Sequence, residues 1–534
     1  MLNTIRNTCV TLLLLGATSS LGAAPGIDDD IATDAQRLID DGTAGAIVLG
    51  YFDENGATTR GFGQVSSTNP QSPNGDTRFE IGSVSKIMTA QLAEVLFRQG
   101  KLDWNWPLTD ALPTWQFADE QVAAIVLSEL AKHTSGLPRL PDNLGVSDTI
   151  DPYAAYDAAA LQRFLTTFKP DALKKQPAYS NLSAGLLGFI AGEVAGTTYQ
   201  RALSTHLLTP LNLAQTSPGH DKKLDVQLAQ GMSYGRPVSP WHFDALAGAG
   251  AVVSTANDML RWLQHTLDPN ALDGALHDQL GGDAWRGAAW NRRDDLEGGT
   301  AFAHGGQTAG FATLALIQPE ANRGLVVLAT SADNSAIAGL GLKLISDHDT
   351  AETTSLEGLS GAYQLGPGFY VHIFRHGDAL WAQATNQGAF ELSPASDGSW
   401  RFAPAGISIT FTLDDSGTAS ALVLDQSGRQ TPASRDPNSA LRDVSTLETE
   451  QLEDFIGRYQ LTADAVLEIT HQDSGHLMVQ LTGQPTFPAF AFATDQFLLK
   501  VVDAQLEFER GEDGNIVAVT LVQNGRQRAT RIVE

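Results

Sequence analysis

The first part of the chain alternates between longer stretches with apolar positions at helical spacing and shorter runs rich in β-branched residues. Residues 45–52 and 58–66 predict an opening hairpin, and residues 311–319 and 324–332 predict adjacent strands of a central sheet. The longer stretches predict helices over residues 85–100, 183–196, 255–267 and 336–346. The first of these helices ends at a glycine, Gly100. The pattern therefore predicts a mixed α/β unit.

After about residue 355 the pattern changes to short alternating strands separated by Gly and Asp turns, and it repeats. The segment SGAYQL at residues 360–365 recurs as IGRYQL at 456–461, and Phe411 and Phe508 occupy matching positions 97 residues apart. Two copies of one small antiparallel β unit, each expected to be a barrel, explain the repeat. Neither copy carries a convergent cluster of histidine or acidic residues, so we expect both to serve packing or gating.

Composition limits the partners of this chain of 534 residues. With 34 Lys and Arg against 61 Asp and Glu, the formal net charge is −27, which repels phosphate backbones and anionic lipid. Nucleic acid and peripheral membrane binding are therefore not expected, and the charge mainly favours solubility. The single cysteine, Cys9, lies in the N-terminal apolar segment, so the rest of the chain offers no disulfide, thiol nucleophile or cysteine-bound metal.

The N-terminal segment has the pattern of a secretory signal: Arg6, an apolar run through Leu15, and small residues up to Ala24. The run is too short for a comfortable membrane span, and no later stretch approaches about 18 apolar residues. We therefore expect a signal peptide over residues 1–24 and a periplasmic or secreted protein with no membrane anchor after its removal. A retained anchor is the alternative.

The first candidate for chemistry is Ser83, three residues before Lys86 at the start of the first predicted helix. Positions i and i+3 share a helix face, so the Lys86 amine can lie against the Ser83 hydroxyl, which needs a nearby proton acceptor to become a nucleophile. Ser85 points away from that face and is not a candidate. Alone, the pattern is weak, because a capped helix with a solvated lysine has the same sequence.

Two further patterns strengthen the case, and each occurs once. Of ten lysines only Lys86 has a serine three residues before it, and of nine tyrosines only Tyr179 has an asparagine two residues after it, Asn181. Among all lysines and histidines, only His304 precedes a glycine, Gly306, by two positions. Each has a structural alternative: a half-buried tyrosine, a helix-capping asparagine, and a glycine-rich turn between strands.

The segment FEIGSVSK at residues 79–86 resembles the active-site signature of class C β-lactamases. The ordered trio Ser-x-x-Lys, Tyr-x-Asn and His-x-Gly resembles the wider group that also holds D-alanyl-D-alanine carboxypeptidases, D-aminopeptidases and related esterases. The loop HTSGLPRLP, which begins at His133, is similar to a loop common in that group, and His133 itself is expected to be structural.

The resemblance covers roughly residues 27–350 and implies an α/β fold: a β-lactamase/transpeptidase-like catalytic domain with an antiparallel sheet flanked by helices. The paired β units that follow look like the two barrels carried by D-aminopeptidase. The expected domains are a signal peptide, the hydrolase domain and two small antiparallel β-barrels, over residues 1–24, 25–352, 353–442 and 443–534.

The resemblance also implies roles. Ser83 would be the acylated nucleophile, Lys86 would hold and polarise it, and Tyr179, deprotonated or nearly so, would act as general base. An unperturbed tyrosine has a pKa near ~10, and a cationic Lys86 beside it would lower that pKa. Asn181 would hydrogen-bond both the substrate amide and Lys86.

Substrate binding is expected from Asn181, His304, Gly306 and Gln307. The backbone N–H of Gln307, together with that of Ser83, would form an oxyanion hole, which typically contributes about 3 kcal/mol per donor in the transition state. Most members of the group carry lysine where His304 stands, and its ammonium helps to bind the substrate carboxylate. A histidine with a pKa near ~6.5 would bind carboxylates better as the pH falls below that value.

The first functional hypothesis is an exported serine hydrolase of the class C β-lactamase type, which opens a β-lactam amide through an acyl-enzyme without cofactor or metal. The second is a D-amino-acid-specific peptidase or a small-ester esterase on the same site. A non-catalytic binding protein is disfavoured, because a binder needs no nucleophile with its base. Within residues 27–350 the sequence has no His-x-x-x-His metal spacing, and no Gly-x-Ser-x-Gly motif surrounds Ser83. The expected partner is a small molecule: a β-lactam, a D-amino-acid peptide or an ester.

Overall fold

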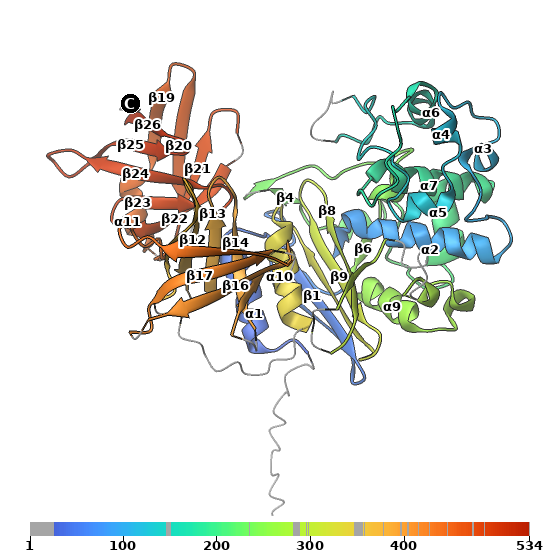
Figure 1. The fold of residues 1–534 in the computed structure, drawn as a ribbon, viewed down its shortest axis with the longest axis horizontal. Helices are drawn as coiled ribbons and strands as arrows, with labels where there is room; N and C mark the ends of the chain where they lie inside the picture. The colour runs from blue at the N-terminus through green and yellow to red at the C-terminus, as the bar shows by residue number, and fades with distance from the viewer. Residues whose placement is uncertain are drawn as a thin grey trace, which may run out of the picture.

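The fold is that of a computed structural model (Figure 1), which describes residues 26–532. Within that range it leaves out 146–150, 234, 281–288, 295, 297, 346–355, 357, 378, 396–397, 403–404, 415, 427, 446, 472–474 and 485. The expected signal peptide and the expected boundary at residues 352/353 therefore lie outside the described residues. None of the helices described is both long enough and apolar enough to cross a membrane.

A six-stranded antiparallel sheet with the order β2-β1-β10-β9-β8-β7 forms the centre of the first unit. The predicted opening hairpin is confirmed as β1 and β2, and the predicted adjacent strands are confirmed as β9 and β10. The strands span Ala46–Asp53 (β1), Gly56–Gly63 (β2), Asn291–Arg293 (β7), Ala301–Gln307 (β8), Ala312–Gln318 (β9) and Arg323–Ala329 (β10).

Helices cover both faces of this sheet, so its central strands are apolar on both sides (Figure 1). In β1, Ile47 and Leu49 join a core with α1 and α10, whereas Ala46 and Val48 join the larger core on the opposite face. The buried helix α2 runs through that larger core with α7 and α9. The helices span Asp29–Asp40 (α1), Ser85–Arg98 (α2), Asn181–Val194 (α7), Ala256–Leu267 (α9) and Asn334–Ile345 (α10).

Shorter elements complete the helical side of the unit. The helices are Leu108–Ala111 (α3), Glu120–Ala123 (α4), Leu127–Ala131 (α5), Ala158–Thr167 (α6) and Tyr199–Leu203 (α8). A two-stranded pair, Arg78–Glu80 (β3) with Val253–Thr255 (β6), precedes the 3-10 turn Gly82–Val84 that leads into α2. A second small pair joins Met232–Ser233 (β4) to Arg236–Pro237 (β5).

Two closed antiparallel barrels of eight strands follow, as the repeat predicts. The first contains Gly361–Gly366 (β11), Phe369–His376 (β12), Ala379–Ala384 (β13), Ala389–Pro394 (β14), Trp400–Phe402 (β15), Ile407–Leu413 (β16), Ala419–Gln426 (β17) and Arg429–Arg435 (β18). After the short helix Thr449–Leu452 (α11), the second contains Gly457–Thr462 (β19), Ala465–His471 (β20), Leu477–Leu481 (β21), Thr486–Ala493 (β22), Gln496–Leu499 (β23), Ala504–Arg510 (β24), Ile516–Val522 (β25) and Arg526–Arg531 (β26).

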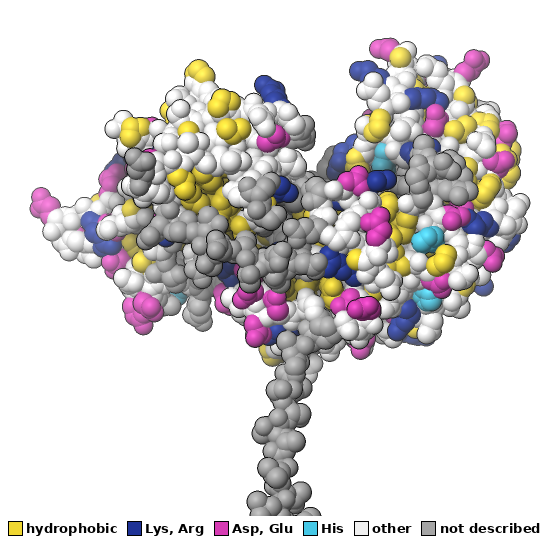
Figure 2. Space-filling view, turned by 60° about the horizontal axis from the view of Figure 1, so that its bottom comes forward, with side chains coloured by type: hydrophobic (Ala, Val, Ile, Leu, Met, Phe, Trp, Pro, Cys, Tyr) yellow, Lys and Arg dark blue, Asp and Glu magenta, His cyan; other side chains and the backbone are white. Residues whose placement is uncertain are grey.

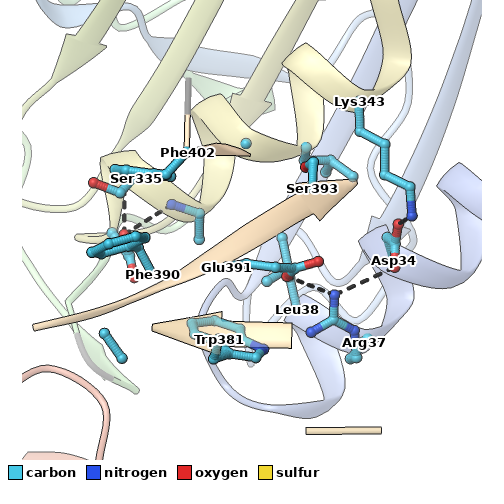
Figure 3. A pocket seen from close by; sticks show the side chains of 15 residues that line it. Asp34, Arg37, Leu38, Ser335, Lys343, Trp381, Phe390, Glu391, Ser393 and Phe402 are labelled. Carbon is cyan, nitrogen blue, oxygen red and sulfur yellow. Dashed lines mark hydrogen bonds and ion pairs between the residues drawn. The ribbon is translucent and has the colours of Figure 1, made fainter. Parts of the chain in front are cut away.

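The first barrel packs against α1 and α10, on the side of the sheet away from α2 (Figures 1 and 3). At this junction the Arg37 guanidinium lies between Asp34, at 3.3 Å, and Glu391 of β14, at 2.8 Å, while Lys343 of α10 also bonds to Asp34. A cavity of about 510 Å³ remains beside these ion pairs. The barrel is thus joined to the sheet unit by charged as well as apolar contacts.

The second barrel reaches the same junction through Lys500, which is buried. Its Nζ lies 3.8 Å from the Trp381 ring centroid of the first barrel and 3.9 Å from Asp41 at the end of α1. The three units therefore meet around one lysine.

On the face shown in Figure 2, acidic side chains are scattered over the surface rather than gathered in one patch.

Candidate active site

Ser83 lies in the 3-10 turn between β3 and α2, beside the end of β8. The preceding Gly82 has a φ of +48°, and a Cβ there would lie 2.6 Å from the backbone nitrogen of Gln307. A Cβ on Gly306 would lie 2.0 Å from the Ile81 carbonyl oxygen. Both positions require glycine, because β8 passes directly against the turn that carries Ser83.

Lys86 lies in the first turn of α2 and is 2% exposed. Its Nζ donates hydrogen bonds to Ser83 Oγ at 2.9 Å and to the Ala249 carbonyl at 2.6 Å. Ser85, by contrast, faces away, and its Oγ accepts a hydrogen bond from the Val252 N–H at 3.1 Å. The lysine and Ser83 thus face each other, as their spacing predicts.

Tyr179 comes from a distant part of the sequence, immediately before α7. Its hydroxyl donates to Ser83 Oγ at 2.6 Å, and its ring centroid lies 4.9 Å from Lys86 Nζ. His133 holds the segment in place: its carbonyl accepts from the Ala178 N–H at 2.8 Å and its Nδ1 from the Ser180 N–H at 3.2 Å. The position of His133 agrees with the structural role expected for it.

The electrostatics of the site correct one expectation. Burial, and to a lesser extent the Arg139 charge, hold the pKa of Lys86 well below its usual value. Burial raises the pKa of Tyr179, an effect that its hydrogen bond to Ser83 only partly offsets. The Tyr179 pKa is therefore raised and not lowered as expected, because burial outweighs its hydrogen bond to Ser83 and the Arg139 charge. Burial shifts both groups toward their neutral forms.

Asn181 is the first residue of α7, and the structure shows neither its expected hydrogen bond to Lys86 nor its alternative role as the helix cap. The helix is capped by Ser180, whose Oγ accepts from the Ser183 N–H at 3.0 Å. Asn181 Nδ2 donates to the Tyr153 hydroxyl at 3.0 Å rather than bonding to Lys86. Its Oδ1 is buried and has no hydrogen-bond partner among the described residues. That oxygen is free to accept a hydrogen bond from a substrate amide.

His304 lies in β8 and is 6% exposed. Its Nδ1 donates a hydrogen bond to the Gly305 carbonyl at 2.6 Å, which leaves Nε2 as the unprotonated nitrogen of a neutral ring. Burial and the Lys86 charge lower its pKa to about 4, not the ~6.5 of a free histidine. The expectation that His304 gains charge below pH ~6.5 is therefore corrected by its burial.

Gln307 ends β8 next to the turn of Ser83. Its side chain is turned to the Ala332 carbonyl, to which Nε2 donates at 2.7 Å, so only its main chain is directed to the site. A Cβ on the neighbouring Gly306 would lie 3.3 Å from the Ser83 nitrogen. The backbone groups of Ser83 and of the end of β8 are thus close together, as an oxyanion hole requires.

A pocket of about 230 Å³ opens beside Ser83, and three aromatic residues on one side of it were not among the sequence candidates. The rings of Tyr153 and Phe243 stack at 4.7 Å, and Trp241 meets Tyr153 edge-on at 5.5 Å. The stretch PWHFD at residues 240–244 places two aromatics in a loop otherwise rich in Gly and Pro. That concentration of aromatics was the available signal.

Glu80, a carboxylate without an obvious partner in the sequence, fixes this aromatic loop. Its Oε1 accepts from the Trp241 N–H at 2.7 Å and lies 2.9 Å from His220 Nε2. The pKa of His220 is raised despite its burial, because Glu80 and Asp225 favour the protonated ring. The strand that leads to Ser83 therefore also positions the opposite wall of the pocket.

Comparison with known proteins agrees with this geometry. The chain belongs to the Beta-lactamase family, whose model matches residues 31–348, more than half of its length. Members of this family are serine hydrolases, and so is this chain. A second model, a domain of unknown function (DUF3471), matches residues 441–531, the region of the second barrel.

Two relatives come from Escherichia coli K12. A "Beta-lactamase" is 28% identical over 308 residues, which are 54% of this chain and 77% of the relative. The "D-alanyl-D-alanine-carboxypeptidase/endopeptidase AmpH" is 28% identical over 260 residues, 47% of this chain and 66% of the relative. The chain therefore spans about two thirds to three quarters of the length of these relatives.

Solved structures show the same fold. A beta-lactamase from Sulfitobacter sp. EE-36 aligns with a TM-score of 0.51 at 24% identity, over 60% of this chain and 98% of that one. A class C beta lactamase from Rhodobacter sphaeroides aligns with a TM-score of 0.52 at 22% identity, with the same coverage. The likeness covers the sheet unit and leaves the two barrels as additions to it.

Proposed function

We propose that this serine hydrolase opens the amide of a β-lactam through an acyl-enzyme on Ser83. The observation that carries the proposal is the contact of one hydroxyl with both an amine and a phenol: Ser83 Oγ lies 2.9 Å from Lys86 Nζ and 2.6 Å from the Tyr179 hydroxyl. A serine needs such a partner to lose its proton as it attacks. The Beta-lactamase relative supports the substrate class.

In acylation, Ser83 Oγ attacks the carbonyl carbon and its proton passes to the neutral Lys86 amine. The carbonyl oxygen becomes an oxyanion that accepts hydrogen bonds from the backbone N–H groups of Ser83 and Gln307. As the C–N bond breaks, Tyr179 donates its proton to the leaving nitrogen, and the cationic Lys86 then stabilises the phenolate and returns the proton to it. Water repeats the sequence at the acyl-enzyme and releases Ser83.

This assignment makes Lys86 the first proton acceptor and Tyr179 the proton donor to the leaving group. It reverses the order expected from the sequence, because burial favours the neutral form of both side chains. The phenol loses its proton only after a cation has formed 4.9 Å from its ring centroid. The two pKa shifts are therefore part of the proposed mechanism.

A second candidate is a peptidase for D-amino-acid peptides, such as a DD-carboxypeptidase or D-aminopeptidase, or an esterase for small esters. The AmpH relative supports the peptidase, and the same three side chains would carry either reaction. We also propose, from the pattern of residues 1–24, that the chain is exported to the periplasm or secreted. Fractionation of cells that express the full chain tests the export.

The test is covalent labelling followed by a substrate panel. The wild-type protein, treated with a fluorophosphonate or a slow β-lactam, should gain the mass of one adduct on the peptide that contains Ser83, and Ser83→Ala should gain none. Nitrocefin, a D-alanyl amide and p-nitrophenyl butyrate then rank the three substrate classes. An adduct that persists in Ser83→Ala, or full activity of that variant, would contradict the proposal.

A further inference from the structure

A second cation lies against Tyr179, and the proposed mechanism does not use it. The Cζ atom of Arg139 is 5.1 Å from the centroid of the Tyr179 ring, the same ring that lies 4.9 Å from Lys86 Nζ. The Tyr179 hydroxyl contacts Ser83 Oγ. The guanidinium is thus one aromatic ring away from the proposed nucleophile.

Arg139 is exposed and, within the part of the chain that the structure describes, its side chain forms no ion pair or hydrogen bond. The chain as a whole has 61 acidic side chains against 34 basic ones, so acidic partners for an arginine are plentiful. Arg37, Arg78 and Arg98 all contact carboxylates. An exposed arginine that lies against the Tyr179 ring and has no such partner among the described residues is available to an anionic ligand.

The main chain of Arg139 fixes where this cation lies. Its carbonyl accepts from the N–H groups of Asn181 at 3.0 Å and Leu182 at 3.2 Å, and the preceding Pro138 carbonyl accepts from Ser180 Oγ at 2.7 Å. The loop is therefore hydrogen-bonded to the start of α7, which Tyr179 precedes by two residues. The side chain of Arg139 makes none of these bonds, so its removal leaves the loop in place.

His304 occupies the position at which most members of the group carry a lysine that helps to bind the substrate carboxylate. Here this residue is not suited to bind a carboxylate. His304 is buried, its Nδ1–H is committed to the Gly305 carbonyl, and its pKa of about 4 leaves it neutral at pH 7. A neutral ring gives no charge-assisted contact. Recognition of an anionic substrate, if it occurs at this site, must come from another cation.

We propose that Arg139 binds a carboxylate of the substrate and makes the site selective for anionic acyl compounds. The inference rests on the proposed acyl-transfer function. A guanidinium presents a planar fork of N–H donors that matches the two oxygens of a carboxylate, and its charge persists at every working pH. It also provides local attraction for anions on a protein whose net charge of −27 repels them.

The experiment compares wild type with Arg139→Ala and Arg139→Lys on two matched pairs of substrates. Phenylacetyl thioglycolate and its methyl ester place the carboxylate on the leaving group, and mono-p-nitrophenyl glutarate and its methyl ester place it on the acyl group. We expect Arg139→Ala to lower kcat/KM about tenfold or more for the charged member of at least one pair, mainly through KM. The uncharged member should change by less than about twofold, and Arg139→Lys should recover part of the loss.

Two controls accompany the comparison. Arg201→Ala removes another exposed arginine, on α8, and should affect both members of each pair equally. Raising the salt concentration from about 50 to about 500 mM should reduce the ratio of kcat/KM in wild type to kcat/KM in Arg139→Ala for the charged substrate, because salt screens the guanidinium while the repulsion by the net charge is common to both proteins. The pair that responds identifies the end of the substrate that Arg139 contacts.

Equal losses for charged and uncharged members in both pairs, or no loss for either, would overturn the role of Arg139. That result is distinct from failure of the proposed function. If the uncharged esters are hydrolysed and Ser83 is labelled, only the Arg139 inference is wrong. If no substrate is hydrolysed and Ser83 takes no label, the acyl-transfer function itself fails.

Discussion

The hydroxyl of Tyr179 lies 2.6 Å from Ser83 Oγ, although the two residues are 96 positions apart in the sequence. The contact exists because the loop from His133 to Arg139 is hydrogen-bonded to residues 178–182 and holds the start of α7 over the turn before α2. Everything proposed about catalysis depends on this one long-range approach, and the predictions below test what each neighbour contributes.

The first prediction concerns which side chain accepts the serine proton. In wild type, kcat/KM for a neutral ester should rise with pH through the lowered pKa of Lys86, because only the free amine can accept a proton. Lys86→Met should lose about 10²–10⁴-fold in kcat together with this acidic limb. Tyr179→Phe should be slower but keep the limb. If the rise of kcat/KM with pH were retained in Lys86→Met and abolished in Tyr179→Phe, the tyrosine and not the lysine would be the acceptor of the serine proton.

The second prediction concerns His304 and pH. Since burial lowers its pKa to about 4, the ring stays neutral through the usual assay range, and KM for a carboxylate substrate should be flat between about pH 5.5 and 8. A rise in affinity centred near pH ~6.5 in wild type, absent in His304→Asn, would contradict the buried, neutral state of this ring.

The same shift predicts a change in stability. In the unfolded chain the His304 ring binds a proton near pH ~6.5, whereas in the folded chain it does so only near pH 4. His304 therefore has no effect on stability above pH ~6.5 and destabilises the fold progressively as the pH falls toward 4. At pH 4.5 the cost should be about 2 to 3 kcal/mol. Urea unfolding of wild type and His304→Asn at pH 7.5 and 4.5 should therefore show a smaller loss of stability on acidification in the variant.

The third prediction concerns the aromatic side of the pocket. Phe243→Ala removes the ring that stacks on Tyr153 at 4.7 Å, so KM for a phenylacetyl ester should rise about tenfold relative to an acetyl ester. Phe189→Ala, which removes a ring packed on Trp115 at 5.2 Å, is the matched control and should lower stability without changing that ratio. Equal ratios in the two variants would show that Phe243 does not contact the acyl group.

The fourth prediction concerns the barrels. Tyr363 and Tyr459 are buried at equivalent positions, and their hydroxyls donate to the carbonyls of Leu359 at 2.7 Å and Phe455 at 2.8 Å. Replacing either with Phe removes one buried hydrogen bond and should cost about 1 kcal/mol of unfolding free energy. The two losses should be similar, and kcat should not change. A large loss of activity in either variant would indicate that a barrel takes part in catalysis.

Local features of the fold could be predicted because they depend on neighbours in the sequence. Helix α2 and the i, i+3 relation of Ser83 to Lys86 follow from helical geometry, and the hairpin of β1 and β2 follows from two adjacent apolar runs. The two barrels could be predicted because the chain repeats itself. The Ser180 cap was missed, because Ser180 and Asn181 are both good capping residues and the sequence does not say which one begins the helix.

Other features required the folded chain. The loop of Trp241 and Phe243 is held at the pocket by main-chain hydrogen bonds to two carboxylates far away in sequence, Glu80 and Asp151. That Arg139 has no carboxylate partner among the described residues depends on the distances between folded segments, and a sequence contains no such distances. These relationships form when segments with no fixed spacing pack together.

The amino-acid order alone was enough to mark the proposed nucleophile with its lysine, the α/β unit and the duplicated barrels, since each depends on helical or strand periodicity or on internal similarity. Tertiary packing alone decided how the pKa values of the site are shifted. A pKa responds to burial and to charges brought near by folding, and these lowered the pKa of Lys86 and of His304 and raised that of Tyr179.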